Sequence, residues 1–373
     1  MQHCKRNSTR GFTLLELMIA LSVGLIVIGG AVQLFSRAVN ATFIVSERAQ
    51  MQQDSRAAEN MIIKDISQAG AGLQPGGVGL ASGTGTAPTY GCDQAKCYVG
   101  GGAVPSGIAY PNKYMSWIVP GYRMGPILQA GQPATDVITV VYADTFFLLN
   151  EYAVTFNNPA GTSVTFCLPA TPAVPPCPAG TPPATPPQLV SDPVYGLKTG
   201  DLILLQNTTA GSTAMAVAEI TANVTGLGPT FVASLADPDS LHMNQSLATS
   251  GEVAQMTAGA GTTATRIWVV TYYVDNTTDP NHARLMRQVN GQTPVPVADN
   301  VSDLRFTYDT YDDLGNLQTG VGDIGVTSPN MIRKVNIAHL TFRTSLTGTT
   351  GFQGIDIQTS VSARNMSFKN RYN

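Results

Sequence analysis

The sequence has 373 residues, of which 12% are charged, and its formal net charge is -3. This balance excludes a strongly basic surface for nucleic acid, and no long acidic run indicates a disordered tail. The length allows a membrane segment together with one or two domains that bury their own apolar core.

The N-terminal region combines a short basic stretch with a long apolar run. Three basic residues lie among the first ten, and the run from Phe12 to Phe35 has one charged residue, Glu16. As a helix this run would measure about 36 Å, more than the hydrocarbon core of about 30 Å in a bilayer. Basic residues ahead of the run predict a cytoplasmic N-terminus and an exported remainder. The alternative, a secretory signal peptide, has a shorter apolar core and a small-residue cleavage site.

The helical pattern continues beyond the apolar run. Apolar residues recur at helical spacing with charged and polar residues between them: Ala38, Ala41, Val45, Ala49, Met51, Ala58, Met61, Ile62 and Ile66. The stretch "GAGLQPGG" at 70–77 ends the pattern, because glycine and proline do not sustain a helix. We therefore expect one helix over 12–69, transmembrane at about 12–35 and amphipathic afterwards. A coiled-coil anchor is the alternative, but strict heptads are not sustained.

The remaining sequence, 70–373, predicts a β-rich exported domain. Residues 70–135 are rich in glycine and turns, and strands are expected at 136–143, 152–156, 201–207, 214–221, 266–275, 283–289, 301–309, 333–345 and 355–365. A proline-rich loop is expected at 168–187, since its prolines preclude a central strand. Alternation of apolar and polar residues in the later strands indicates an antiparallel sheet covered on one face. The predicted fold class is α+β, with the amphipathic half of the helix packed on this sheet. Whether 70–373 forms one domain or two stays open.

Four of the five cysteines follow the apolar run, and all four lie in the predicted exported part. Their spacing suits two short disulfide loops, Cys92–Cys97 and Cys167–Cys177, in an oxidising compartment. Four cysteines allow three pairings, of which the short-range one is the simplest. Zinc binding is less favoured, because neither pair has the spacing of a structural zinc site.

No catalytic constellation is present in the sequence. There is no nucleophile elbow, zinc-protease helix or phosphate loop, and the histidines at 242, 282 and 339 are isolated. We expect no enzyme activity, no cofactor and no metal site. Asp309, Asp312, Asp313 and Asn316 resemble calcium ligands in type, but their spacing is not that of an EF-hand, and a solvated hairpin turn is favoured.

The stretch "RGFTLLELMIALSVGLIVIG" resembles the N-terminal signal of type IV prepilins and pseudopilins. The resemblance implies that residues 1–11 are a leader peptide, removed by a prepilin peptidase that cuts between Gly11 and Phe12. It also implies N-methylation of Phe12 and assigns Glu16 as the family's glutamate.

A carboxylate in hydrocarbon is costly, so Glu16 is expected to face a partner. Cleavage after Gly11 would create an amine on Phe12 about one helical turn away, on the same chain or on a neighbour. In the family this glutamate is thought to neutralise the N-terminus of an adjacent subunit. Apolar side chains of the run would then pack against other pilin helices, among them Leu14, Leu17, Leu21 and Leu25.

Patches of the exported part resemble the PilW group of type IV pilus assembly proteins, which are minor pilins. They are "ITVVYAD" at 138–144, "DLILLQN" at 201–207, "VVTYYVD" at 269–275, "LMRQV" at 285–289, "VSDLRFTYD" at 301–309, "IRKVNIAHLTFRTS" at 332–345 and "TSVSARN" at 359–365. The J-type minor pseudopilins of type II secretion are similar in the same way. A third alternative is an adhesin or ligand-binding module at the filament tip.

The PilW resemblance implies a filament subunit that promotes pilus assembly and supports twitching motility and adhesion. The expected partners are prepilin peptidase, other minor and major pilins, the inner-membrane assembly platform and, before assembly, inner-membrane lipid. No nucleic acid is expected. The expected location is the inner membrane, single-pass with a periplasmic C-terminal domain, and then the pilus at the cell surface.

Overall fold

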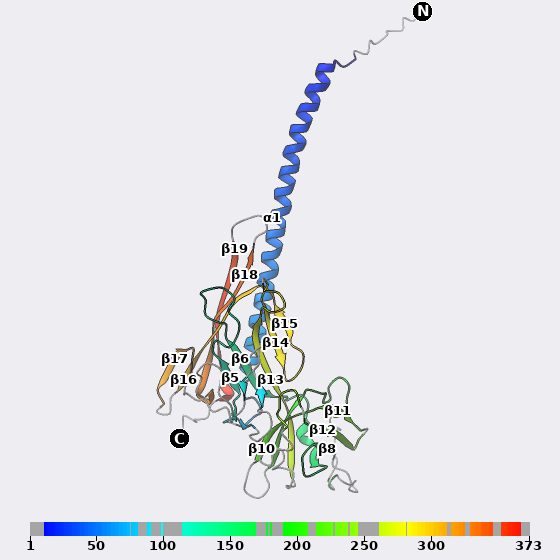
Figure 1. The fold of residues 1–373 in the computed structure, drawn as a ribbon, viewed down its shortest axis with the longest axis vertical. Coiled ribbons are helices and arrows are strands. Elements are labelled where there is room, and N and C mark those ends of the chain that lie inside the picture. The colour runs from blue at the N-terminus through cyan, green and yellow to red at the C-terminus, as the bar shows by residue number, and fades with distance from the viewer. Residues whose placement is uncertain are drawn as a thin grey trace, which may run out of the picture. The chain divides into compact units, whose positions relative to one another are not determined.

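The structure is a computed structural model, and Figure 1 shows its ribbon with many of the elements labelled. It describes residues 11–74, 76–80, 88–90, 98–99, 114–168, 177, 180, 189–207, 214–226, 228–237, 239–244, 261–280, 282–311, 315–324, 329–345 and 352–366. The chain divides into two compact units, Met1–Gln53 with Thr344–Gln353, and Asp54–Arg343 with Gly354–Asn373.

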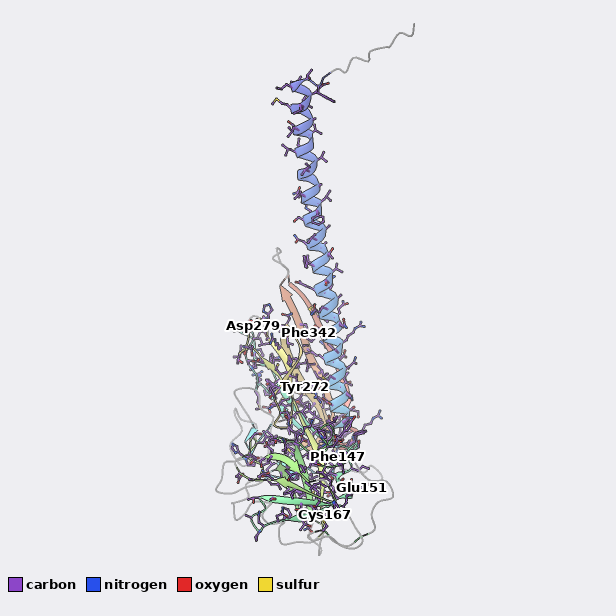
Figure 2. The ribbon with its side chains drawn as sticks, turned by 90° about the vertical axis from the view of Figure 1, so that its right-hand side faces the viewer. Phe147, Glu151, Cys167, Tyr272, Asp279 and Phe342 are labelled. Atoms are coloured by element: carbon purple, nitrogen blue, oxygen red, sulfur yellow. A yellow bond between two sulfur atoms is a disulfide. The ribbon has the colours of Figure 1, made fainter. Side chains whose placement is uncertain are left out.

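Helix α1 spans Leu14–Gln68, and its residues up to 53 belong to the first unit. No residue from 14 to 50 is buried, although most of residues 14–35 are large and apolar. Figure 2 shows their side chains projecting from every side of the helix. A helix that is apolar all round is stable only inside lipid or among other helices.

The last part of α1, from Asp54, belongs to the second unit and has one buried face. Ser55, Ala58, Ile62 and Ile66 are almost fully buried, and their spacing of three or four residues places them on one side of the helix. Each fully buried isoleucine contributes about 1.5–3 kcal/mol. The last part of the half predicted to be amphipathic therefore has its buried face, whereas the predicted apolar positions Ala38, Ala41, Val45 and Ala49 are exposed.

The helix ends because Gly70 adopts a left-handed conformation, with φ of +72°. Its N–H donates to the carbonyl of Val141 at 2.8 Å, and the N–H of Ala143 donates to the carbonyl of Ala71 at 2.9 Å. A side chain at position 70 would also approach Trp117, since an added Cβ would lie 3.0 Å from its ring. The helix exit is thus fixed directly to strand β6 (Val137–Ala143).

Within the described residues the larger sheet has eleven strands, all paired antiparallel. Its main path follows the order β10–β9–β13–β7–β8–β12–β11, and β5, β6, β14 and β15 extend from β13 and its neighbours. The bounds are β5 Ile118–Gly121, β6 Val137–Ala143, β7 Ala153–Phe156, β8 Ser163–Cys167, β9 Leu202–Asn207, β10 Ala214–Glu219, β11 Ala222–Thr225, β12 Thr230–Ser234, β13 Thr262–Asp275, β14 Arg284–Val289 and β15 Val295–Ala298.

Strand β13 holds this sheet together, because its 14 residues pair with different strands along their length. Residues 262–267 pair with β9, residues 267–272 with β6, and residues 270–275 with β14. At about 3.3 Å per residue the strand is about 46 Å long, more than twice the usual length of a strand.

The part of the sheet around β7–β12 has a hydrophobic core of its own, which includes Phe147, Tyr152, Phe166, Ile203 and Phe231. The rings of Tyr152 and Phe231 meet edge to face with centroids 5.9 Å apart. Such pairs contribute about 0.5–1.5 kcal/mol beyond their buried area. In Figure 1 the labelled strands β8, β10, β11 and β12 lie together at the lower end of the second unit.

A second sheet has four strands in the order β17–β16–β18–β19, with bounds β16 Val301–Tyr311, β17 Leu317–Val321, β18 Ile332–Ser345 and β19 Phe352–Ser362. The predicted alternation in β16 is confirmed, since Leu304, Phe306 and Tyr308 are buried and the residues between them are partly exposed. Asp136, just before β6, joins β16 to the larger sheet: its carboxylate accepts the N–H of Phe306 at 2.9 Å.

Short elements complete the description. Two small sheets pair β1 Val78–Gly79 with β4 Tyr114–Met115 and β2 Thr89–Tyr90 with β3 Tyr98–Val99, and 3-10 turns cover η1 Leu149–Glu151, η3 Pro329–Met331 and η4 Arg364–Met366. The predicted α+β class, one long helix with antiparallel sheets, is confirmed. The predicted domain boundaries remain a prediction. Apart from residues 168, 177 and 180, the loop predicted at 168–187 lies outside the described residues.

Candidate functional site

The predicted cleavage point lies just ahead of helix α1, where the backbone has no regular structure. Gly11 and Phe12 are exposed, and the Phe12 side chain is 87% accessible. Among the described residues beyond its chain neighbours, a Cβ added at Gly11 would meet no atom within 4 Å. Because the fold does not require glycine at position 11, a requirement for it would come from the processing enzyme.

Glu16 and Thr13 form a capping box at the start of α1. The Glu16 carboxylate accepts hydrogen bonds from the backbone N–H and the hydroxyl of Thr13, both at 3.1 Å. In return the N–H of Glu16 donates to the Thr13 hydroxyl oxygen at 3.3 Å. This reciprocal arrangement satisfies two helix N–H groups that have no partner within the helix.

The helix was predicted to begin at Phe12, but it begins at Leu14. The cap explains the difference, because Thr13 is the capping residue and lies outside the helix. The "T-x-x-E" pattern of residues 13–16 is the signal in the sequence for this helix start. In the uncleaved chain the Glu16 carboxylate therefore has a partner other than the Phe12 amine, which forms only on cleavage.

The helix after this cap can cross a membrane by length and composition, and it is the one such helix within the described ranges. The four leucines predicted to pack against other helices are all exposed: Leu14 81%, Leu17 58%, Leu21 57% and Leu25 63%. The single chain offers them no partner surface, so their contacts with other pilin helices stay a prediction.

In the second unit the end of α1 is attached to the larger sheet through the buried carboxylate of Asp65. It accepts hydrogen bonds from Tyr142 of β6 at 3.1 Å, Tyr272 of β13 at 2.6 Å and Nε of Arg287 of β14 at 2.9 Å. Burial, and then the Asp65 charge, raise the pKa of both phenols, so both remain donors. Figure 2 labels Tyr272 beside the helix.

The strand register brings these groups together. Tyr272 lies opposite Arg287, and Trp268 lies opposite Tyr142. Residues opposite each other, or separated by four along a strand, point to the same face of a sheet, so these side chains share one face. Sequence reasoning missed this site. The available signal was an acidic residue, Asp65, within the apolar face of the amphipathic helix.

Arg266, on the same strand, joins two loops of the second unit. Its Nε donates to Asp144 at 2.8 Å, and its Nη1 donates to the carbonyls of Tyr195 at 2.8 Å and Gly196 at 3.2 Å. Its guanidinium lies over the ring of Phe147 at 4.6 Å and that of Trp268 at 4.9 Å. Stacked and hydrogen-bonded in this way, Arg266 fixes the geometry of both loops.

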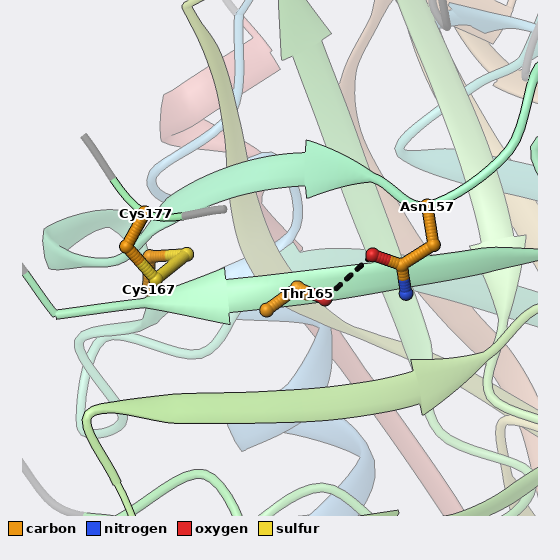
Figure 3. The surroundings of a disulfide bond; sticks show 4 residues. All are labelled: Asn157, Thr165, Cys167 and Cys177. Atoms are coloured by element: carbon orange, nitrogen blue, oxygen red, sulfur yellow. Dashed lines mark hydrogen bonds between the residues drawn. A yellow bond between two sulfur atoms is a disulfide. The ribbon is translucent and has the colours of Figure 1, made fainter. Parts of the chain in front are cut away.

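The disulfide Cys167–Cys177 is present, and both cysteines are buried at the end of β8 (Figure 3). On the same strand the Thr165 hydroxyl donates to Asn157 at 2.7 Å, as Figure 3 also shows. The second predicted pair, Cys92 and Cys97, lies outside the described residues.

The histidines and aspartates weighed in the sequence have ordinary structural partners. His282 lies 2.9 Å from Asp279, and His339 lies 3.1 Å from Asp356. Asp309 accepts hydrogen bonds from the Gly320 N–H and the Asn336 amide, both at 3.0 Å. The antiparallel pairing of β16 with β17 shows the predicted hairpin, but its Asp312 and Asp313 lie outside the described residues. No group of three metal-ligating side chains occurs within the part of the chain that was described.

Comparison with known proteins gives a match at the N-terminal segment. Residues 6–32 match the model of the prokaryotic N-terminal methylation motif, a range that contains Gly11, Phe12 and Glu16. No curated protein and no solved structure matched the chain. This motif implies processing by a prepilin peptidase and assembly with other pilins, and the apolar helix is consistent with membrane anchoring. The motif, the long apolar helix and the antiparallel sheets together identify the chain as a type IV prepilin- or pseudopilin-like protein.

Proposed function

We propose that this protein is a minor pilin of the type IV pilus. Prepilin peptidase would remove residues 1–11, Phe12 would be N-methylated, and the mature chain would enter the filament to promote its assembly. The observation that carries the proposal is the methylation motif at residues 6–32, which covers the start of a helix whose large apolar side chains from Leu14 to Phe35 are all exposed. Such a helix requires lipid first and neighbouring helices afterwards.

The size of the second unit supports a minor role. It contains an eleven-stranded and a four-stranded sheet on one short helical segment. A unit of this bulk on every subunit would crowd a tightly packed filament shaft. We place it at or near the filament tip, in the complex that initiates assembly.

A J-type minor pseudopilin of a type II secretion system is the second candidate, because the methylation motif belongs to both kinds of system. A pseudopilin helix would pack in the same way. The two candidates differ in the assembly that the subunit starts, which is a surface pilus in one case and a secretion system in the other. A tip-displayed adhesin remains a third candidate.

Deletion of the gene, with complementation by the wild-type chain, tests the proposal. The expected result is loss of surface pili and twitching motility, both restored by the wild-type chain, with secretion unaffected. Loss of protein secretion with normal pili would instead establish the pseudopilin function. Normal numbers of pili with lost adhesion would establish the adhesin function.

A further inference from the structure

A cavity of about 330 Å³ lies within the second unit, where the end of α1 meets β6, β13 and β14. Its lining includes Lys64, Gln68, Tyr142, Thr145, Phe146, Trp268 and Arg287, with Asp65 and Asp144. This volume is at the small end of the range for ligand pockets, which begins at about 300 Å³. The cavity therefore suits a ligand the size of one amino-acid residue or one monosaccharide.

The two cations that line the cavity have hydrogen-bonding capacity to spare. Arg287 contacts Asp65 and the Tyr272 hydroxyl through Nε, while its terminal Nη1 and Nη2 groups make no hydrogen bond to a described residue. Nor does the exposed Lys64 ammonium form an ion pair within the described part of the chain. A guanidinium held through Nε presents its other edge to a planar anion such as a carboxylate.

The negative charges of the two carboxylates that line the cavity are already paired with cations of the chain. Asp65 accepts from two phenols and from Arg287, and Asp144 is paired with Arg266. Asp144 also accepts the N–H of Phe146 at 2.9 Å. Arg266 also lies 3.9 Å from Asp201. Among the charged side chains that line the cavity, Lys64 alone forms no ion pair with a described residue, so its ammonium is available to an anionic ligand.

Two aromatic side chains form another part of the wall. Trp268 is stacked against the guanidinium of Arg266, and the exposed ring of Phe146 lies beside that of Tyr195, with centroids 5.7 Å apart. Aromatic walls beside a few polar groups are typical of small-molecule sites.

We propose that this cavity is a binding site for a carboxylate on a compact ligand, with Arg287 and Lys64 holding the carboxylate and Trp268 and Phe146 covering the ligand's apolar face. The carboxylate can come from an acidic amino-acid residue or from an acidic monosaccharide. Neither the methylation motif nor the pilus role assigns this site, so the inference stands apart from the proposed function.

The test uses the full chain in a detergent without aromatic groups. The chain has two tryptophans, and Trp117 is buried, so tryptophan fluorescence mainly reports ligands that reach Trp268. The probes are N-acetyl-glutamate amide and glucuronate, with N-acetyl-glutamine amide and glucose as matched neutral controls. We expect a saturable change with at least one acidic probe and none with its neutral control, and the responding probe identifies the source of the carboxylate. Calorimetry repeats the titration without a fluorophore.

Three variants locate the site. Lys64→Gln is expected to weaken binding about tenfold, as for loss of one charged hydrogen bond. Arg287→Lys keeps the charge that pairs with Asp65 but loses the planar edge, and is also expected to weaken binding. Arg56→Gln removes an exposed charge from the same helix outside the cavity and should leave binding unchanged. Circular dichroism confirms that each variant is folded. No saturable signal with either acidic probe, equal binding of the neutral controls, or equal binding by the variants at 56 and 64 would overturn the proposal.

Discussion

The carboxylate of Asp65 on helix α1 accepts a hydrogen bond from Arg287 on strand β14 at 2.9 Å, across 222 positions of sequence. Asp65 is buried, and the same carboxylate accepts from Tyr142 and Tyr272. One helix residue thereby contacts three strands of the larger sheet. Because each of these donors is at least partly withdrawn from water, the network fixes how the helix end lies on the sheet.

Replacing Asp65 with alanine tests this role. It would leave two phenols and a guanidinium without their acceptor, and we expect a loss of about 3 kcal/mol in the free energy of unfolding. The urea midpoint of the full chain in detergent measures this loss. Arg56→Gln, an exposed change on the same helix, should shift the midpoint little. Equal midpoints for the two variants would show that the network does not contribute to stability.

Gly11→Ala separates processing from folding. Position 11 has open space for a methyl group, so the variant should fold normally. We nevertheless expect the prepilin peptidase to leave it uncut, visible as an unshifted band on a gel and as intact residues 1–11 by mass spectrometry. A cleaved, N-methylated product from this variant would refute the assignment of Gly11 as the cleavage residue.

The two roles of Glu16, capping and charge, can be separated by one pair of substitutions. Glutamine also closes a capping box, so Glu16→Gln keeps the cap and loses the charge. Thr13→Ala keeps the charge and loses the cap, worth about 1 kcal/mol of helix stability.

If the charge neutralises a neighbouring Phe12 amine, Glu16→Gln and Glu16→Ala should both be processed, and both should give few pili. Thr13→Ala should then retain most of its pili. Counting filaments by electron microscopy decides the matter. Normal pili in Glu16→Gln would assign Glu16 a capping role only.

Stability should depend on pH through two buried carboxyls. Burial, and then the charge of Glu219, raise the pKa of Asp239 to about 7, although it accepts the N–H of Met243. Burial likewise raises the pKa of Asp136 to about 6. Both values exceed that of the unfolded chain, so the folded protein keeps protons that the unfolded chain has released. The free energy of unfolding should therefore fall as pH rises from about 4 to about 7.

Asp239→Asn identifies the higher of these two steps. The amide oxygen can still accept the N–H of Met243, but the side chain no longer ionises. The contribution of Asp239, which spans about pH 4 to 7, should disappear, so the profile should flatten between about pH 6 and 7 and keep only the Asp136 decline at lower pH. Urea midpoints measured every half unit of pH resolve the two. An unchanged profile in the variant would mean that Asp239 ionises normally in the folded protein.

Removal of the Cys167–Cys177 disulfide should destabilise the second unit. The bond closes a loop with a sequence separation of 10, for which the chain-entropy estimate is about 2–3 kcal/mol. Replacing both cysteines with serine tests this bond alone, whereas a reductant would also act on any other disulfide. The urea midpoint should fall accordingly. A midpoint equal to that of the wild type would show that the bond contributes nothing to stability.

Strand prediction succeeded where the pattern was long and local. The strands around Phe306 and Tyr272 read clearly because many consecutive apolar or alternating residues fix the period. Strands β8 and β12 were missed: each has five residues, and each is stabilised by pairing with the other across more than sixty intervening positions. Strand β5 was not predicted because it contains Pro120, and proline is tolerated in a strand only at the edge of a sheet. Among the described strands β5 pairs with β6 alone, so it is an edge strand.

Local sequence is enough to define the N-terminal segment and the class of the fold. The predicted cleavage glycine, the apolar helix and its glutamate are read from neighbouring residues, because helix formation and membrane insertion depend on local spacing and composition. The tertiary structure decided which side chains meet. Asp65, Tyr272 and Arg287 lie far apart in the chain, and only the antiparallel register of β13 with β14, and the packing of α1 upon them, brings their charges and hydroxyls within hydrogen-bond distance.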